Sequence, residues 1–456
     1  MTRSHPRFLL PSRRVLITAA CATAGALALA ACGAAAPSSP SASAGPGSFK
    51  GQTLTVQHNP ITTNAAGYNK YYSALAAAFT KATGATVKYE STSMSFQEQM
   101  PQIAASQSGP DIIAASTSAS AYQSNAFVHL SAADWQEIGG QGQFNPGQLN
   151  DSGPAGGPYD EVPLYNVPYV MVYNTQLFKA AGITAPPTTW TQYVADAQKI
   201  NDPAKGVYGT SMDPTDSANQ DAWKTPFYFL QSYGGAFATA DGQPTLTTDP
   251  ATEAYSFWFD WYTKFHIVNP NSLTWQNPQM IASFAAGQVG ELPAVTSADI
   301  PLFESGKIGK NFAFAPEPGL PYGASTYPPG GHQPSRLGQA GLYITSFAPT
   351  ALALQFIKVV LSTPMQVLQY QTTGDLPVTK QAVTAVLNGN PGLLKPFLQA
   401  LQSNEQPEPF TTWWNAAELG LVGMSSKLAS TAATSGALSP SDIRSALAST
   451  QSSLQQ

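Results

Sequence analysis

The sequence contains very little cysteine and very little charge. Only two of its 456 residues are cysteine, Cys21 and Cys32. The chain beyond them can form no disulfide bond and no cysteine metal site, so its stability must come from a hydrophobic core. Charged residues make up 10% of the chain, with a formal net charge of −5, whereas about 25% is usual for soluble proteins. A weakly charged, acidic chain does not attract phosphate backbones, so we expect no nucleic-acid partner.

Motifs of common catalytic and metal sites are also missing. The chain has no Gly-x-Ser-x-Gly, no His-Glu-x-x-His and no phosphate-binding loop, and its five histidines are isolated. Asp213, Asp216 and Asp221 form an acidic cluster, but their spacing is not that of a calcium loop, which favours a solvated loop. We therefore expect no cofactor, no metal and no enzymatic activity.

The N-terminus has the pattern of an export signal. Residues 1–31 contain four arginines and no acid, and they end in an uncharged, mostly apolar run. The run leads into Leu-Ala-Ala-Cys-Gly, which resembles a bacterial lipobox in which the thiol of Cys32 receives a diacylglycerol. We predict a lipoprotein signal peptide over residues 1–31, lipidation at Cys32, and anchoring to the outer face of the cytoplasmic membrane.

Other interpretations of this segment stay open. It could be an ordinary signal peptide with an incidental cysteine, and its apolar run is shorter than the ~20 residues of a membrane span. Residues 12–16 (SRRVL) also resemble a twin-arginine signal, so export by Sec or Tat is undecided. Loss of residues 1–31 would change the net charge to −9, because four arginines leave with them.

The rest of the chain alternates between strand and helix patterns. Residues 32–49 are rich in Pro, Ser, Ala and Gly, which predicts a flexible tether. Hydrophobic periodicity then predicts successive strands and helices. Their ranges are strand 54–56, helix 68–83, strand 85–89, helix 96–106 and strand 109–115. This order predicts a parallel sheet with ligand loops at the carboxyl ends of its strands.

Residues 161–190 are the most informative stretch. A hydrophobic strand is predicted over 162–173, ended by Asn174, and a short helix over 176–181 that Gly182 stops. Two prolines follow, and a threonine pair can cap a helix that begins near Trp190. The order VPLY, VYN, LFKAAGI, PPTTW resembles the signature block of maltose-binding-protein-like ABC solute-binding proteins, the extracellular solute-binding protein family 1.

The resemblance continues in order over about residues 51–430. Matching segments are 54–63, 110–120, 284–289, 312–318, 337–344 and 374–378. It implies an α/β, two-lobed periplasmic-binding-protein fold of type II. Each lobe would have a central, mostly parallel sheet flanked by helices, with the ligand cleft between the lobes. The implied N-terminal lobe comprises 51–167 and 337–376, and the implied C-terminal lobe comprises 168–336 and 377–450.

The implied function is the capture of a sugar or oligosaccharide and its delivery to an ABC permease, by a protein expected to be monomeric. Alternatives are a binding protein for a polyamine, peptide or iron complex, or a lipid-anchored glycosidase, which would need two facing carboxylates. Eight Trp, nineteen Tyr and twenty-one Phe leave aromatic rings available for stacking on sugar rings.

Ligand contacts are expected from strand-end loops and from aromatic side chains at the cleft. Position in the family pattern suggests Trp223 and Trp413 as stacking residues, while Trp258 and Trp261 are expected to pack in a core. The remaining candidates are His58, Asn59, Thr62, Ser116, Thr117, Ser118, Tyr165, Asn166, Gly338 and Gln339. The loop after 109–115 lacks the carboxylate that many sugar-binding relatives place there, so the class of ligand is open.

Overall fold

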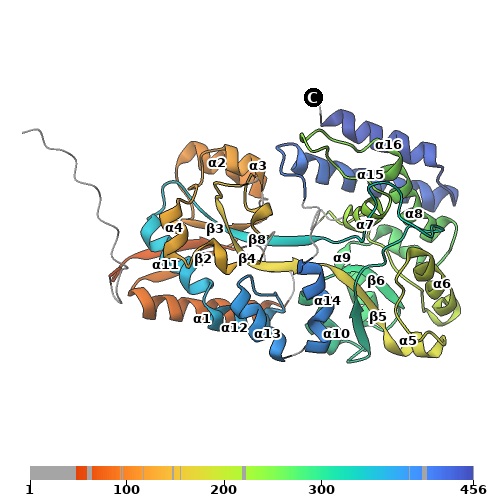
Figure 1. Ribbon diagram of the computed structural model, residues 1–456, viewed down its shortest axis with the longest axis horizontal. Coiled ribbons are helices and arrows are strands. Elements are labelled where there is room, and N and C mark those ends of the chain that lie inside the picture. The colour runs from red at the N-terminus through yellow and green to blue at the C-terminus, as the bar shows by residue number, and fades with distance from the viewer. Residues whose placement is uncertain are drawn as a thin grey trace, which may run out of the picture. The chain divides into compact units, whose positions relative to one another are not determined.

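The computed structural model describes residues 48–58, 64–92, 94, 96–116, 118–145, 148–154, 156–217, 222–389, 391–402 and 408–454. The chain divides into two units, Met1–Ala42 and Ser43–Gln456, and all described residues belong to the second. The predicted signal peptide, Cys32 and nearly all of the tether lie outside the described residues. Within the second unit, two sheets each carry their own helices, and we call these assemblies the N-terminal and C-terminal lobes (Figure 1).

The sheet of the N-terminal lobe has the strand order β2-β1-β3-β8-β4. Its strands are β1 (Thr53–Gln57), β2 (Thr86–Glu90), β3 (Ile112–Ala115), β4 (Glu161–Pro168) and β8 (Leu337–Ile344). β1 pairs in parallel with β2 and with β3, whereas β8 pairs antiparallel with both β3 and β4. The β-α-β-α-β order predicted from the sequence is therefore confirmed for the first three strands.

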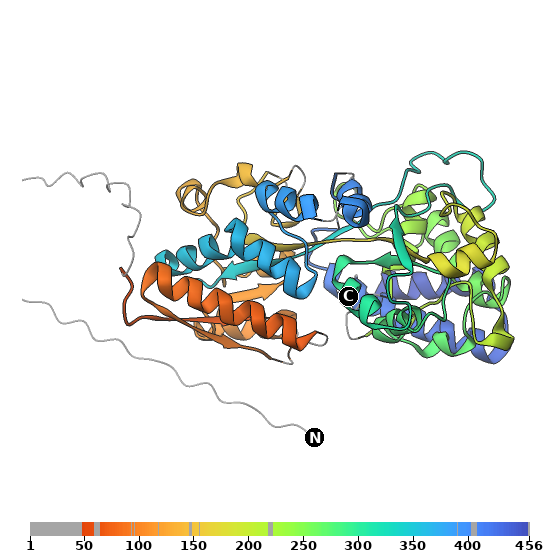
Figure 2. The same ribbon diagram turned by 90° about the horizontal axis from the view of Figure 1, so that it is seen from below.

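Helices cover this first sheet. They are α1 (Ala65–Thr83), α2 (Phe96–Ser106), α3 (Ala119–Gln123), α4 (Ala132–Glu137), α11 (Thr350–Val360) and α12 (Thr363–Thr373), with 3-10 turns at Gln141–Gln143 and Gln148–Asp151. Helix α1 buries Tyr71, Leu75 and Phe79, which recur every four residues on one helical face. Gly84 ends it in the left-handed conformation. Figure 2 shows α1 beside α11 and α12.

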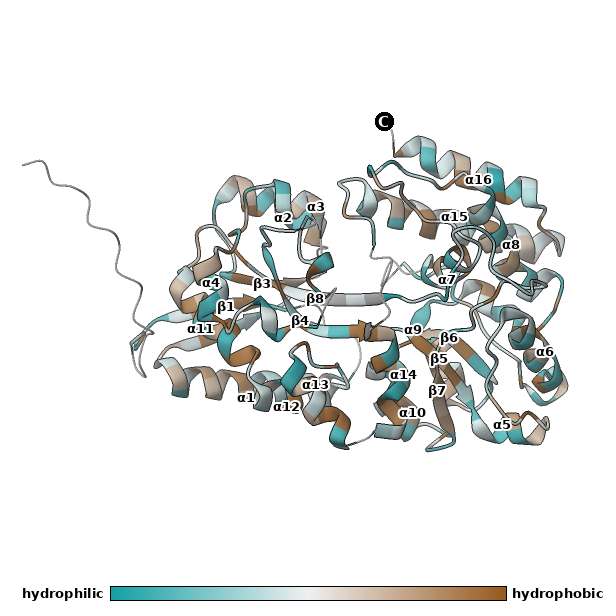
Figure 3. Ribbon diagram, viewed as in Figure 1, coloured by the Kyte–Doolittle hydropathy of each residue, from teal (hydrophilic) through white to brown (hydrophobic). Residues whose placement is uncertain are grey.

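The sheet of the C-terminal lobe has the order β6-β5-β7. Its strands are β5 (Val170–Asn174), β6 (Glu291–Val295) and β7 (Phe312–Ala315), which Figure 3 colours as hydrophobic. Both pairings are antiparallel, so the expected mostly parallel arrangement fails for these strands. The reason is that β5 enters from the N-terminal lobe and runs against its neighbours. Short parallel bridges, Tyr208 with Val289 and Thr210 with Val268, continue the sheet beyond β6.

Ten helices of the described chain belong to the C-terminal lobe. They are α5 (Thr175–Ala180), α6 (Trp190–Ile200), α7 (Lys224–Ser232), α8 (Asp249–Thr263), α9 (Asn277–Ala285), α10 (Ile300–Ser305), α13 (Lys380–Gly389), α14 (Pro391–Gln402), α15 (Trp414–Ser435) and α16 (Pro440–Ser453). Three 3-10 turns lie at Pro203–Lys205, Pro270–Thr274 and Ser297–Asp299. The predicted packing role of Trp258 and Trp261 is confirmed, since both are fully buried in the aromatic core of this lobe.

Three chain segments connect the lobes. β4 leads through Tyr169 into β5, residues 316–336 lead from β7 back to β8, and residues 374–379 lead from α12 to α13. β4 and β8 are paired along their length and run side by side between the lobes (Figure 1). Asn166 on β4 fastens the third segment, because its side-chain amide donates to the Pro377 carbonyl at 2.6 Å. The exact lobe boundaries given above stay predictions.

The local signals of residues 161–190 are confirmed except in one respect. Asn174 caps α5 by accepting from the backbone N–H groups of Gln176 and Leu177, and Thr189 caps α6. The single strand predicted over 162–173 is wrong, because the chain forms β4 and β5 with Tyr169 between them. The break at Tyr169 arises because β4 pairs within the sheet of the N-terminal lobe, whereas β5 pairs within the sheet of the C-terminal lobe.

Among the helices that the structure describes, none by itself has the length and apolar composition of a membrane span. Helices α11 and α12, bent by 63° at their junction, meet both criteria only when they are taken together.

Candidate functional site

The two paired strands bring Tyr169 and Arg336 together where the chain passes between the lobes. Tyr169 separates β4 from β5, and Arg336 directly precedes β8. The Tyr169 backbone N–H donates to the Arg336 carbonyl at 3.2 Å, which fixes both residues at the same level of the junction. Both residues are buried at this level, with Tyr169 8% and Arg336 6% exposed.

Arg336 lies at the centre of an arginine cluster, which we define as Tyr169, Trp223, Lys224, Arg336, Glu408 and Trp414. The guanidinium carbon is 4.5 Å from the centre of the Tyr169 ring and 4.8 Å from that of Trp223. The ammonium group of Lys224 is 4.8 Å from the centre of the Tyr169 ring. Both cations are thus attracted by the electron-rich faces of aromatic rings.

Glu408 ties the arginine to a neighbouring helix. Its carboxylate accepts from Nη2 of Arg336 and from the indole N–H of Trp414, the latter at 3.1 Å. The Arg336 side chain is only 7% exposed. Its Nε and Nη1 atoms are buried and have no hydrogen-bond partner among the described residues. Unpaired buried donors are unfavourable, so this part of the cluster is incomplete as it stands.

The charges of the cluster act on the Tyr169 phenol. Burial raises its pKa, but the positive charges of Lys224 and Arg336 outweigh burial and the net shift is downward. A neighbouring acid, Glu418, behaves in the opposite way, because burial and then the charge of Glu408 raise its pKa well above the usual value. The cluster therefore contains two cations, while only Glu408 among these acids pairs directly with the guanidinium.

Two helices begin at the arginine cluster without a capping side chain. Trp223 precedes α7 and Trp413 precedes α15, and neither residue makes a side-chain capping hydrogen bond. The Trp223 and Trp414 rings meet edge to face at 5.0 Å, which brings the two helix starts together. Helix N-termini favour negative groups because their first N–H groups lack helical partners.

The N-terminal lobe presents a different group of rings. We call His58, Tyr68, Tyr72 and Tyr89 the tyrosine cluster. His58 follows β1, Tyr89 lies near the end of β2, and Tyr68 and Tyr72 belong to α1. The His58 and Tyr72 rings stack at 4.7 Å and 18°, and Tyr72 lies 4.9 Å from Tyr89.

Tyr68 links this cluster to the third connection between the lobes. Its hydroxyl donates to the Asp375 carboxylate at 3.0 Å. Burial, followed by the nearby charge of Asp375, raises the pKa of Tyr68 and also that of Tyr72. The phenols therefore stay neutral at physiological pH, and the cluster offers ring faces and hydroxyl groups rather than negative charge.

Direct contacts join the two lobes beyond the connecting strands. Asn415 of α15 donates to the Ser118 hydroxyl at 3.4 Å, and the Ser120 hydroxyl donates to the Thr412 carbonyl at 3.4 Å. The Tyr122 ring meets Phe410 edge to face at 5.9 Å. The segment 408–415 thus contacts both Arg336 and the loop after β3, so it responds to any change in the distance between the lobes.

The structure describes eight of the twelve predicted ligand residues with their side chains, namely His58, Ser116, Ser118, Tyr165, Asn166, Trp223, Gly338 and Trp413. His58 and Tyr165 are half-buried, Ser116 is exposed, and Gly338 lies on β8. Ser118 is buried and caps α3. Asn59, Thr62 and Thr117, together with the Gln339 side chain, lie outside the described residues. Ligand contact by any member of the predicted set stays a prediction.

The two predicted stacking tryptophans differ in exposure. Trp413 is half-buried and its indole N–H donates to the Gly242 carbonyl at 2.8 Å. Trp223 is 0% exposed and packs against Phe227 and Phe237 as well as Trp414. A ligand could reach the Trp223 ring only if its neighbours moved, so its role as a stacking residue stays a prediction.

Sequence reasoning missed Arg336, Lys224 and Tyr169. One signal could have indicated the first of these, because only two arginines occur after residue 14, Arg336 and Arg444. Arg336 also stands next to the return strand that the family pattern places near the cleft. The partners of Arg336 are far away in the sequence, so its burial and its stacking could not be predicted.

The acidic cluster at residues 213–221 is not the solvated loop that its sequence suggested. Asp213 is 5% exposed and Asp216 is 0% exposed. Burial, together with the charge of Asp216, raises the pKa of Asp213 to about 7. Asp221 lies outside the described residues. The described part of the chain contains no group of three or more His, Cys, Asp or Glu side chains suited to hold a metal ion.

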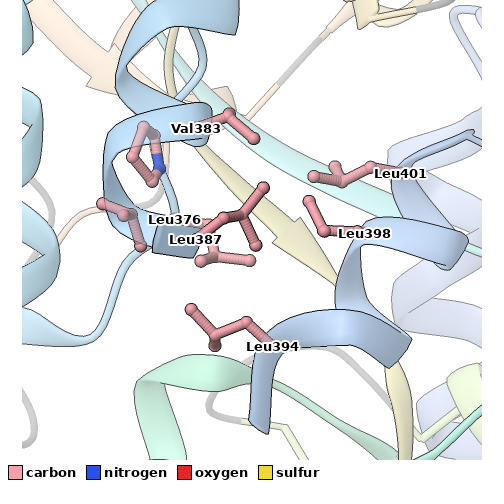
Figure 4. Close-up of a pocket in the computed structure, with 8 residues that line it drawn as sticks. Leu376, Val383, Leu387, Leu394, Leu398 and Leu401 are labelled. Atoms are coloured by element: carbon pink, nitrogen blue, oxygen red, sulfur yellow. The ribbon is translucent and has the colours of Figure 1, made fainter. Parts of the chain in front are cut away.

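A small apolar pocket near the third connection does not suit a polar ligand. It lies between α13 and α14 and is lined by Leu376, Pro377, Val383, Val386, Leu387, Leu394, Leu398 and Leu401 (Figure 4). Its volume is about 10 Å³, which is the space of about one water molecule. The pocket therefore cannot hold a sugar.

Solved structures with the same fold cover most of the chain. A maltose-bound protein described as MalE3 from T. maritima is 18% identical, with a TM-score of 0.72 over 88% of this chain and 99% of its own. A solute-binding protein from Thermotoga lettingae bound with α-D-tagatose is also 18% identical, with a TM-score of 0.70 over 88% of this chain and 100% of its own. These likenesses show the two-lobed type II fold.

Sequence comparison identifies the family. A probable amino-acid ABC transporter periplasmic-binding protein from Sinorhizobium fredii is 30% identical over 125 residues, which is 27% of each chain. The chain thus spans only about a quarter of the length of that curated relative. The family model for bacterial extracellular solute-binding proteins matches residues 63–367, which include the signature block, β4 to β7, and the return strand β8. The chain therefore belongs to the bacterial extracellular solute-binding protein family.

Proposed function

We propose that this protein is the solute-binding component of an ABC importer and captures a sugar or oligosaccharide between its two lobes. The observation that carries the proposal is the full-length likeness to sugar-bound structures, at TM-scores of 0.70 and 0.72 over 88% of the chain. Aromatic rings on both sides of the junction, in the tyrosine cluster and in the arginine cluster, support it, because flat rings stack on the apolar faces of sugar rings.

Binding would use the three connections between the lobes as a hinge. When the lobes separate, the contacts of segment 408–415 with Ser118 and Tyr122 break, and the ligand enters. When they close, stacking contributes affinity, and polar side chains select among epimers because an unpaired buried polar group costs ~1–3 kcal/mol. No covalent step is involved, so we propose a binding protein and not an enzyme.

Export and membrane anchoring form part of the proposal. Residues 1–31 would be removed, and Cys32 would carry a diacylglycerol that holds the monomeric protein on the outer face of the cytoplasmic membrane, beside the permease. Mass spectrometry of the purified protein's N-terminal peptide tests this directly. A lipid-modified Cys32 is expected, and an unmodified N-terminus at another residue would contradict the anchor.

A non-sugar solute is the second candidate, because a curated relative is described as belonging to an amino-acid transporter. A polyamine is disfavoured, since Lys224 and Arg336 at the junction would repel it. Ferric iron is disfavoured by the raised pKa values of Tyr68 and Tyr72, which result from burial and then the charge of Asp375 and which oppose phenolate formation.

A thermal-shift screen of the full chain tests the proposed function. It would include mono-, di- and oligosaccharides, amino acids, peptides, polyamines and ferric citrate, with chromogenic glycosides as the assay for hydrolysis. A ligand at a hundred times its Kd should add ~2.7 kcal/mol of stability. A selective sugar shift is the expected result. A shift from another class alone would overturn the sugar assignment, and hydrolysis of a glycoside would overturn the proposal that the protein binds its solute without catalysis.

A further inference from the structure

The guanidinium of Arg336 is held in place but is not fully hydrogen-bonded. Its guanidinium carbon lies over the rings of Tyr169 and Trp223, and Nη2 is paired with Glu408. Nε and Nη1 have no hydrogen-bond partner among the described residues, although the side chain is only 7% exposed. A group that is fixed by packing, carries a permanent charge and retains unused N–H donors is suited to bind an anion.

The surroundings add donors rather than acceptors. The indole N–H of Trp223 is buried and also lacks a partner among the residues that the structure describes. The uncapped starts of α7 and α15 lie at the same place, since Trp223 and Trp414 are in contact there. Helix starts of this kind favour carboxylates. An uncharged sugar needs donors and acceptors in similar numbers, whereas these groups are almost all donors.

One carboxylate pairs with the guanidinium of Arg336. It belongs to Glu408, which also accepts from the indole N–H of Trp414. Burial raises the pKa of Glu317 to about 8, and burial followed by the charge of Glu408 raises the pKa of Glu418 well above its usual value. Both shifts favour the neutral form of these two acids.

We propose that the solute carries a carboxylate and that this carboxylate binds the Nε and Nη1 N–H groups of Arg336 beside the starts of α7 and α15. The inference rests on the proposed function, the capture of a solute between the lobes. It requires a carboxylate on that solute, which is then an acidic sugar or, under the second candidate function, an amino acid. Separation of the lobes, which breaks the contacts of segment 408–415 with Ser118 and Tyr122, exposes Arg336 to the incoming ligand.

Matched pairs of ligands test the proposal on the full chain. Isothermal titration would compare glucuronate with glucose and galacturonate with galactose, and a second arm would compare alanine with alaninamide, which lacks the carboxylate. At least one carboxylate ligand is expected to bind at least tenfold more tightly than its neutral counterpart, a difference of ~1.4 kcal/mol. The arm that responds identifies the source of the carboxylate.

Three variants assign the preference to Arg336. Arg336→Gln should abolish the preference for the acidic ligand, and Arg336→Lys should retain part of it because the charge remains. Glu408→Gln should tighten carboxylate binding, since it removes the negative group closest to the guanidinium. Arg444→Gln is the matched control. Arg444 and Arg336 are the two arginines after residue 14, and Arg444 forms an exposed ion pair with Asp249.

The ratio of acidic to neutral affinity separates recognition from a purely structural role. If Arg336→Gln does not fold, Arg336→Lys and Glu408→Gln still report on that ratio. Equal affinity for both members of every pair, or a neutral sugar as the preferred ligand, overturns the carboxylate inference and leaves the proposed function standing. If no sugar, acidic or neutral, binds and no amino acid binds, both proposals fall.

Discussion

The tyrosine cluster and the arginine cluster lie on different lobes and have opposite chemistry. His58 and Tyr72 stack face to face beside neutral phenols, whereas Arg336 lies between two rings with its charge held in place. Ring faces can stack on many planar or pyranose ligands. A buried guanidinium, in contrast, binds only a ligand that carries hydrogen-bond acceptor atoms. The comparison teaches that the C-terminal lobe can determine the class of ligand, and the N-terminal lobe can add affinity of lower selectivity.

The largest effect is expected at the most deeply buried member of the arginine cluster. Trp223→Ala should reduce the free energy of unfolding by ~3–5 kcal/mol, because it removes a fully buried ring from a packed core. Urea denaturation followed by circular dichroism measures this. Trp223→Phe serves as the milder control. A loss below ~1 kcal/mol for the alanine variant would show that the ring is not a core element, and would favour the cleft-facing role.

The pH dependence of stability tests whether the acids near the arginine cluster are protonated. Burial raises the pKa of Glu317 to about 8 and that of Asp213 to about 7, against ~4 in an unfolded chain. A raised folded pKa means that the folded state holds more protons, so the contribution of these two groups to stability is fully present below their unfolded pKa of ~4 and is lost as pH rises to ~8.

Thermal unfolding between pH 5 and pH 8 should show this fall, and Glu317→Gln should make the curve flatter. The backbone N–H of Ala294 can still donate to the amide oxygen, as it does to Glu317 at 2.8 Å. A melting temperature that rises between pH 5 and pH 8 would contradict the raised pKa values of Glu317 and Asp213.

Trp413 allows binding to be separated from folding. Trp413→Ala should weaken sugar binding at least tenfold, or ~1.4 kcal/mol, with a smaller loss of stability than Trp223→Ala because Trp413 is only half-buried. Isothermal titration and thermal denaturation of the same variant give both quantities. Trp275→Ala, which alters another half-buried tryptophan of this lobe, is the control and should leave the affinity unchanged. Unaltered affinity in Trp413→Ala would remove Trp413 from the site.

The smallest effect is expected from the N-terminal lobe. Tyr72→Ala removes the ring that stacks on His58 and should weaken acidic and neutral ligands by the same few-fold factor, because the phenol that is removed is neutral. Competition titrations with glucuronate and glucose measure the two factors side by side. If Tyr72→Ala weakened the affinity for glucuronate but not that for glucose, the N-terminal lobe would also select for charge, and the proposed difference between the lobes would be wrong.

The fold was largely predictable, whereas the arginine cluster was not. Helix α2 has the bounds predicted from its hydrophobic period, and strand β8 has those of the segment that resembles the family's return strand. The break at Tyr169 could not be predicted, because it depends on pairing with two different sheets. The burial of Asp213 and the stacking of Arg336 depend in the same way on distant segments, and local sequence contains no signal for them.

The claim that the ligand enters between the lobes can be tested by locking them together. Ser118→Cys with Asn415→Cys, in a chain whose Cys21 and Cys32 are replaced by Ser, places two thiols where the lobes now share a 3.4 Å hydrogen bond. After mass spectrometry has verified the disulfide, titration with maltose, galacturonate and any sugar chosen by the screen compares oxidised and reduced protein. We predict that oxidation blocks uptake and that reduction restores it. Equal binding by the locked and the reduced protein would contradict a site between the lobes.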